Sequence, residues 1–228
     1  MENTAFDLTA AQESLLNAAL THVAFDGWSD ACLKAAAVDA GIAPGLVRIL
    51  FPRGAVDLAA AYHRRGDREM LARLVASTHA GLRFRERVTL AVRLRLEVAD
   101  RDVVRRGMAL FSLPPHMATG AALVWGTADA IWTALGDTST DVNWYTKRAT
   151  LSAVYSASVL YWLGDTSEGH AETWGFVDRR IADVMWFEKT KADFRASPLA
   201  RILAGPLKLL DRIKAPASVP DDLPGQKG

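Results

Sequence analysis

Residues 136–163 read GDTSTDVNWYTKRATLSAVYSASVLYWL. The Ser-Thr-Asp run at 139–141 supplies competent helix N-caps, and the mostly apolar sequence after it predicts a long helix over 141–163. On that helix the adjacent side chains of Trp144 and Tyr145 point about 100° apart, so they cannot both face one core. At least one is expected at the surface, where large aromatic side chains dominate recognition. A first-turn aromatic tucked under a loop is the alternative.

The rest of the chain is also expected to be helical. Apolar residues recur at three- and four-residue spacing, and neither a strand-like alternation nor an internal repeat is present. The fold class is therefore all-α. The predicted helices cover residues 9–25, 30–41, 43–51, 55–64, 67–80, 84–96, 100–111, 118–135, 141–163 and 168–188.

The composition is that of a folded globular protein. Half of the 228 residues are hydrophobic, which is enough to bury a real core. A net charge of +1 gives no overall electrostatic reason to bind nucleic acid. A single cysteine, Cys32, excludes an internal disulfide and fits a protein of a reducing compartment. Its side chain is expected to be buried in the protein core. With no apolar leader and no run of about 18 apolar residues, we expect a soluble or membrane-surface protein.

The first 60 residues resemble the N-terminal DNA-binding domain of TetR-type regulators in helix spacing and apolar positions. A DNA-reading helix needs polar side chains for base edges and phosphates. Here the corresponding segment, 43–50, carries only Arg48 as a charged residue, and residues 26–60 hold three basic against four acidic residues. We therefore expect a TetR-like scaffold that does not read DNA. A TetR-type regulator with an apolar effector is the alternative.

Nothing in the sequence argues for an enzyme, a metal or a cofactor. The five histidines lack metal-ligand spacing and are expected to be surface or capping residues. Asp137 and Asp141 lie in a capping segment that accounts for them without catalysis. The arginine-rich zone 64–106 is interleaved with acidic residues, which is typical of solvated helix faces.

A set of uncommon residues in the second half resembles one family, densely from 114 to 181. That family is the lipid-binding accessory proteins of ubiquinone (coenzyme Q) biosynthesis, the ninth Coq protein and its bacterial relatives. The residues that carry the resemblance are Trp132, Gly136-Asp137, Ser139-Thr140-Asp141, Asn143-Trp144-Tyr145-Thr146, Arg148, Tyr155, Thr173-Trp174 and Asp178-Arg179-Arg180.

The resemblance implies a ligand and a partner. The ligand would be an isoprenoid quinone precursor, and the partner would be the di-iron demethoxyubiquinone hydroxylase. Ile131 stands where the family is expected to carry methionine, a change between two apolar residues. The implied partner-binding patch comprises Asp141, Trp144, Tyr145, Arg148 and Ile131.

The second half holds more bulky aromatic residues than a tight core needs, which favours a lipid-sized apolar cavity there. A filled core or a helix–helix dimer seam is the alternative. The residues expected to line this cavity are Trp125, Trp132, Leu135, Tyr155, Trp162 and Trp174.

The segment 191–214 predicts a basic amphipathic helix. Five basic residues accompany the apolar stripe, against Asp211, which suits the headgroup region of an anionic membrane. Pro206 is expected to kink or shorten this helix, and docking on the protein body is the alternative. The stripe consists of Leu199, Ile202, Leu203, Leu207, Leu210 and Ile213.

The expected organisation is a TetR-like region (1–60), a lipid-binding and dimerisation region (61–190), the amphipathic helix (191–214) and a disordered tail (215–228). The sequence thus favours a non-catalytic homodimeric lipid carrier on the cytoplasmic face of a bacterial inner membrane. Besides the regulator, a pure scaffold whose pocket is filled by side chains remains open.

Overall fold

The chain folds into helices that begin at identifiable caps. The structure, a computed structural model, describes residues 7–77, 81–196 and 214–215, with side chains of the last helix described to residue 184; all regular elements in these ranges are helical. They are α1 (Leu8–Asp26), α2 (Asp30–Asp39), α3 (Pro44–Leu50), α4 (Ala55–Ala76), α5 (Phe84–Glu97), α6 (Arg101–Phe111), η1 (Pro114–His116), α7 (Met117–Ala134), α8 (Val142–Gly164), η2 (Glu168–His170) and α9 (Ala171–Ala196).

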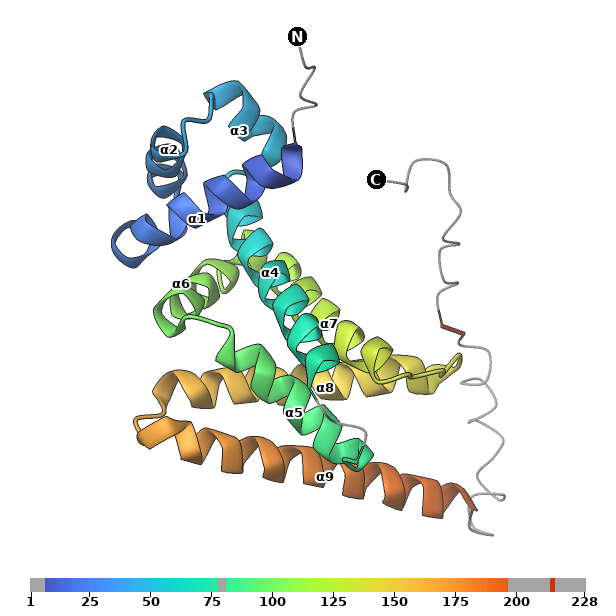
Figure 1. Ribbon diagram of the computed structural model, residues 1–228. Helices are drawn as coiled ribbons and strands as arrows, with labels where there is room; N and C mark the ends of the chain where they lie inside the picture. Colours follow the sequence, from blue (N-terminus) through green and yellow to red (C-terminus); the bar gives the residue numbers. More distant parts are fainter. Residues whose placement is uncertain (1–6, 78–80, 197–213, 216–228) are drawn as a thin grey trace.

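Helices α1 to α3 pack against the start of α4 around one core (Figure 1). Asp7 caps α1 by accepting from the amides of Thr9 and Ala10, so the helix begins at Leu8, one residue before the predicted start. Ser29 caps α2 as its position in the sequence indicates. Cys32 is fully buried here, as predicted, and burial raises the pKa of its thiol to about 11, which leaves it unreactive.

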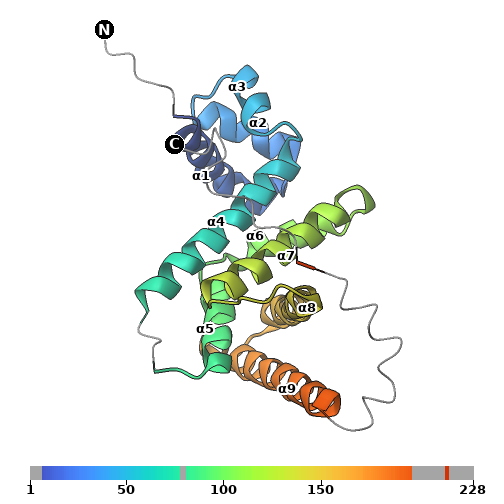
Figure 2. The same cartoon turned by 90° about the vertical axis from the view of Figure 1, so that its right-hand side faces the viewer.

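One helix, α4, replaces the two predicted over residues 55–64 and 67–80. The predicted break fell at residues 65 and 66, and both lie inside α4 instead. A Cβ placed on Gly66 would meet the guanidinium of Arg95 at 2.7 Å, so the glycine lets that side chain lie against the helix backbone. The residue therefore serves close packing and does not end the helix. As Figure 2 shows, α4 runs from the N-terminal helices into the second half of the molecule.

A second core lies among α4, α5, α7, α8 and α9. Asp141 caps α8 by accepting from the Asn143 amide, in agreement with the sequence pattern. The antiparallel helices α8 and α9 run side by side through this half (Figure 1). The arginine zone is partly structural: Arg95 is buried, and Arg101 donates to the carbonyls of Trp162 and Asp165 at the end of α8. The prediction of solvated faces is wrong for these two residues.

Replacing Gly66 with alanine is expected to destabilise the protein by about 1–3 kcal/mol, because the new methyl group would push the Arg95 guanidinium out of place. Gly126→Ala is the matched control. Gly126 lies in α7, and a methyl group added there would meet no atom within 4 Å, so alanine should stabilise by about 0.5–1 kcal/mol. Urea unfolding of both variants measures the difference, and equal effects would contradict this account of Gly66.

Candidate functional site: an apolar cavity and an aromatic surface

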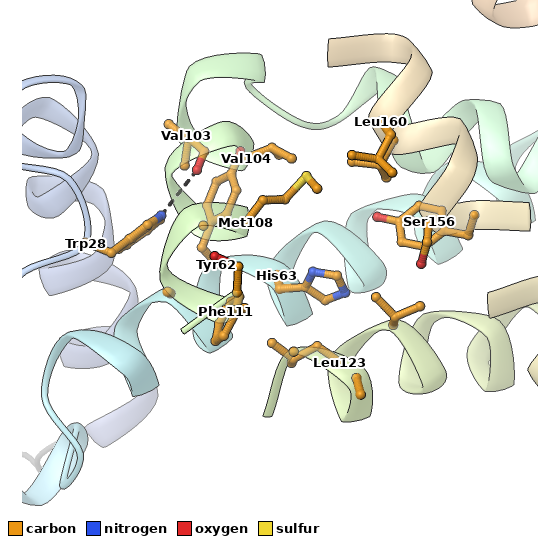
Figure 3. A pocket seen from close by; sticks show the side chains of 18 of the residues that line it. Trp28, Tyr62, His63, Val103, Val104, Met108, Phe111, Leu123, Ser156 and Leu160 are labelled. Atoms are coloured by element: carbon orange, nitrogen blue, oxygen red, sulfur yellow. Dashed lines mark hydrogen bonds between the residues drawn. The ribbon is translucent and has the colours of Figure 1, made fainter. Parts of the chain in front are cut away.

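An apolar opening lies where the two cores meet. It encloses about 390 Å³ between α4, α6, α7 and α8. The indole of Trp28 forms one end and donates to the Val103 carbonyl at 3.2 Å (Figure 3). The other lining residues are Ala59, Tyr62, His63, Arg95, Val103, Val104, Gly107, Met108, Phe111, Ser112, Met117, Gly120, Ala121, Leu123, Val124, Tyr155, Ser156, Val159 and Leu160.

A hydrogen-bonded polar chain stands at one wall of this cavity. The Nε2 atom of His63 lies 2.8 Å from Oγ1 of Thr127, and that hydroxyl lies 2.8 Å from Oδ1 of Asp67. Arg95 donates from Nε to the same carboxylate oxygen at 2.7 Å and from Nη2 to the His63 carbonyl at 3.0 Å. The chain links α4, α5 and α7, and it faces the ring of Tyr155 on α8.

His63 is neutral in this setting. Burial, followed by the nearby guanidinium of Arg95, lowers the pKa of its imidazole to about 4, although Asp67 acts in the opposite direction. A neutral imidazole carries one donor and one acceptor nitrogen. The prediction that the histidines are surface or capping residues is therefore wrong for His63, whose side chain is 18% exposed and lies against the cavity.

Most of the residues predicted to line a cavity do not line this one. Of the six, only Tyr155 contributes to its wall. Trp132 borders a separate hollow beside α8, where it stacks on Phe84 at 5.5 Å, and Trp162 and Trp174 border a third. Trp125 and Leu135 line none of these three. Besides Tyr155, the cavity takes its aromatic rings from Trp28, Tyr62 and Phe111, none of which was predicted to line it.

The sequence reasoning missed the contribution of the first half of the chain. Trp28, Tyr62 and Met108 were not among the residues expected to line a cavity, and Trp28, in the turn between α1 and α2, belongs to the predicted TetR-like region. One local signal was present: Gly107 and Met108 are adjacent in α6, and a glycine beside a flexible thioether favours irregular packing. The meeting of α6 with α4 and α8 depends on long-range packing, which local patterns do not encode.

Trp144 and Tyr145 form the predicted aromatic surface together with Trp125. All three side chains are half-buried. The ring centroids of Trp144 and Trp125 are 5.9 Å apart, and those of Trp144 and Tyr145 are 4.8 Å apart in an edge-on arrangement. The hydroxyl of Tyr145 also donates to the backbone carbonyl of Lys214 at 3.3 Å, so Lys214 lies against this surface.

Buried charges hold the aromatic surface from below. The guanidinium of Arg148 lies 4.0 Å from the ring centroid of Trp144 and donates to Asp129 at 2.5 Å and to Asp137 at 3.0 Å. Lys147 donates to Asp137 from the other side at 2.7 Å. Burial opposes ionisation of Asp137, but hydrogen bonds from Lys147, Ser139 and Arg148 outweigh it and lower its pKa to about 2.

Two members of the predicted partner-binding patch are not at the surface. Ile131 is fully buried in the second core, and the side chain of Arg148 is 3% exposed. Arg148 supports the patch from within through its contact with the Trp144 ring, and an arginine with two carboxylate partners is stable when buried. Ile131 belongs to the core. Asp141 is exposed beside Trp144 and Tyr145, so these three are available for contact.

The predicted membrane stripe of Leu199, Ile202, Leu203, Leu207, Leu210 and Ile213 lies outside the described residues. Over the part of the chain that is described, no helix combines the length and apolar character needed to cross a membrane. In the same part, no cluster of three or more His, Cys, Asp or Glu side chains is arranged to hold a metal ion. The exposed side of α3 presents Arg48 beside the apolar Ile49.

Asp137→Asn is expected to cost about 3 kcal/mol of stability, because it removes a buried charge that neutralises Arg148 and Lys147. The folded-state pKa lies below the ordinary value, so this contribution is present above about pH 4 and is lost as pH falls through about 2. The variant should therefore lose less stability than the parent between pH 4 and 2. Asp102→Asn, which breaks an exposed pair with Arg105, is the control and should cost under about 0.5 kcal/mol. Equal losses in both variants would contradict the assignment.

Comparison with known proteins identifies relatives over much of the chain. Residues 117–188 match the COQ9 family model. The "Probable ubiquinone biosynthesis protein coq9, mitochondrial" of Dictyostelium discoideum is 30% identical over 187 residues, which cover 78% of this chain and 61% of the relative. The "Ubiquinone biosynthesis protein COQ9, mitochondrial" of Drosophila melanogaster is 32% identical, covering 77% of this chain and 56% of the relative. The match thus spans about three fifths of the length of these relatives.

A solved structure supports the fold. A TetR transcriptional regulator from Nitrosomonas europaea superposes with a TM-score of 0.63 at 20% identity, covering 78% of this chain and 99% of that one. At this identity the likeness concerns the fold alone, and it confirms the predicted TetR-like, all-α architecture. With the family match over α7 to α9 and the identities across most of the sequence, the chain belongs to the COQ9 family and has a TetR-like fold.

Proposed function

We propose that the protein acts in ubiquinone biosynthesis as a non-catalytic carrier that binds an isoprenoid quinone precursor and presents it to a partner enzyme. The observation that carries the proposal is the apolar cavity between the two cores, with its polar wall at His63. The COQ9 relatives, which are named as ubiquinone biosynthesis proteins, support the pathway.

The cavity has the character of a lipid site. Its volume of about 390 Å³ lies in the range of small-molecule pockets, and its walls are mainly aliphatic and aromatic. This space suits a ring and the first part of an isoprenoid chain, with the remainder outside. A polyprenyl quinone is almost insoluble in water, so a pocket of this kind substitutes for the bilayer around its head.

The aromatic surface of Trp144, Tyr145 and Asp141 is the proposed contact for the partner, a demethoxyubiquinone hydroxylase. Half-buried Trp and Tyr rings, held in place by Arg148, offer rigid apolar area with few rotors to immobilise. The basic amphipathic segment 191–214 would keep the carrier at an anionic membrane surface, and a homodimer would place two such segments there.

Material purified from a ubiquinone-producing host should release isoprenoid quinone precursors at near-stoichiometric amounts on organic extraction and mass spectrometry. Val124→Trp, which fills the cavity from α7, should lower the amount at least about fivefold because the ligand loses its space. Ala122→Trp is the control: residue 122 lies on the same helix but is exposed outside the cavity, so lipid should be retained. An empty extract from well-folded parent protein would rule out the carrier role.

Trp144→Ala should weaken capture of the purified hydroxylase by at least about tenfold, because a central aromatic contact typically contributes about 2 kcal/mol or more. Bound lipid should be unchanged, since Trp144 does not line the cavity. The control is Phe25→Ala, which removes an aromatic side chain that is 86% exposed on α1. Pull-down and surface plasmon resonance measure both, and unaltered capture by the Trp144 variant would contradict the assignment of this surface.

A further inference from the structure

The hydrogen positions in the polar chain follow from the chemistry of its members. The Asp67 carboxylate, paired with Arg95, can only accept hydrogen bonds. Oγ1 of Thr127, which lies 2.8 Å from that carboxylate, therefore directs its hydrogen to it. The Leu123 carbonyl, 3.2 Å from the same hydroxyl, is the more distant and weaker acceptor. The threonine oxygen is then left as an acceptor, and the Nε2–H of His63 donates to it.

This arrangement fixes the tautomer of His63. A neutral imidazole with hydrogen on Nε2 carries a lone pair on Nδ1 and can only accept there. Within the described residues the ring has two hydrogen-bonding neighbours, Oγ1 of Thr127 at Nε2 and the Leu123 backbone carbonyl, and both accept from the single N–H of the neutral ring. The lone pair of Nδ1 has no donor among them, and the ring belongs to the cavity wall. Figure 3 shows the imidazole reaching into the space between Met108 and Leu123. The lone pair of Nδ1 is therefore a hydrogen-bond acceptor that His63 presents to a cavity with mostly apolar walls.

The other polar groups along the cavity do not discriminate in the same way. The hydroxyls of Tyr155 and Ser156 can each donate or accept, so they tolerate a ligand carbonyl as well as a ligand hydroxyl. The Tyr62 hydroxyl already accepts from the Asp100 amide. Arg95 can only donate, and its Nε and Nη2 are already engaged by Asp67 and the His63 carbonyl, while Ser112 donates to the Ala109 carbonyl. The Nδ1 atom of His63 is the group whose neighbours restrict it to accepting.

We infer that the cavity selects ligands whose head carries a hydroxyl donor, a phenol or quinol, and that His63 is the residue that selects them. The inference rests on the proposed function and names the chemical form of its ligand. A phenolic O–H satisfies Nδ1, whereas a quinone carbonyl or a methyl ether leaves that acceptor desolvated and unpaired. Discrimination that depends on an unpaired buried polar group is stronger than discrimination by apolar size.

The test compares 4-hexylphenol with 4-hexylanisole, its methyl ether, by isothermal titration calorimetry. The two probes share the ring and the hexyl chain. They differ in that the anisole carries a methyl group in place of the hydroxyl hydrogen. The parent protein is expected to bind the phenol at least about tenfold more tightly. His63→Phe should bring the ratio close to one while the ether still binds, because phenylalanine keeps the ring volume without the acceptor.

Further variants locate the discrimination. Thr127→Val frees Nε2 and should reduce the ratio, because the hydrogen is no longer held on that nitrogen. Ser156→Ala is the matched control, since it removes a cavity hydroxyl without touching the polar chain, and the ratio should persist. Loss of discrimination in Ser156→Ala with retention in His63→Phe would overturn the inference.

A measurement on the parent protein avoids dependence on variant folding. Nitrogen NMR of protein labelled with ¹⁵N-histidine should show a non-protonated Nδ1 for His63 whose resonance shifts with 4-hexylphenol and much less with 4-hexylanisole. Equal affinity for the two probes, or a protonated Nδ1, would overturn the inference while leaving lipid binding intact. Absence of binding by either probe, with no quinone precursor in the extract of the native protein, would instead overturn the proposed function.

Discussion

The buried ion pair between Arg95 and Asp67 holds the second half of the molecule together. Arg95 is 3% exposed, so its charge depends on the carboxylate at 2.7 Å and on the His63 carbonyl for compensation. Removing one partner of such a pair typically costs about 3–5 kcal/mol, because the other charge is left buried. The pair ties α5 to α4, and Thr127 extends the connection to α7. Because Gly66 has no side chain, the guanidinium of Arg95 can lie against the backbone of α4 at this position.

The cavity exists because this polar chain stands beside the junction of two separately packed cores. The N-terminal core borders the cavity through Trp28 and Val103. The C-terminal core borders it through aliphatic side chains of α7 and α8. Charged and hydrogen-bonded groups in the wall cannot move into an apolar gap without losing their partners. The wall therefore resists collapse, which keeps the volume between Met108, Leu123 and His63 open.

How much could be predicted from the sequence depended on the range of the interactions. Helix periods and caps depend on residues close together in the sequence. The helix α8, its Asp141 cap and the partial exposure of Trp144 were therefore predictable. The break predicted at residues 65 and 66 was wrong because Gly66 accommodates Arg95, 29 positions later in the chain. The polar wall likewise joins residues 63, 95 and 127, which show no joint pattern in the sequence. His63 was interpreted singly as a surface or capping residue and Arg95 as part of a solvated helix face. Aromatic content indicated the C-terminal half, but of the predicted lining residues only Tyr155 reaches the cavity between the two cores, because others pack elsewhere, as Trp132 does on Phe84.

The proposed cavity and partner surface share one helix, and this constrains how a carrier could work. Trp144 lies near the start of α8 and Tyr155 in its middle; at 1.5 Å per residue the 11 positions between them correspond to about 16 Å. The surface at Trp144 is therefore separated along α8 from the part that faces His63, and a ligand head presented at that surface must first leave the polar wall. A neutral imidazole suits that step, since its hydrogen bond contributes about 1 kcal/mol whereas one from a charged group contributes about 1.5–3. The depressed pKa of His63 thus favours a carrier that recognises its ligand and still releases it.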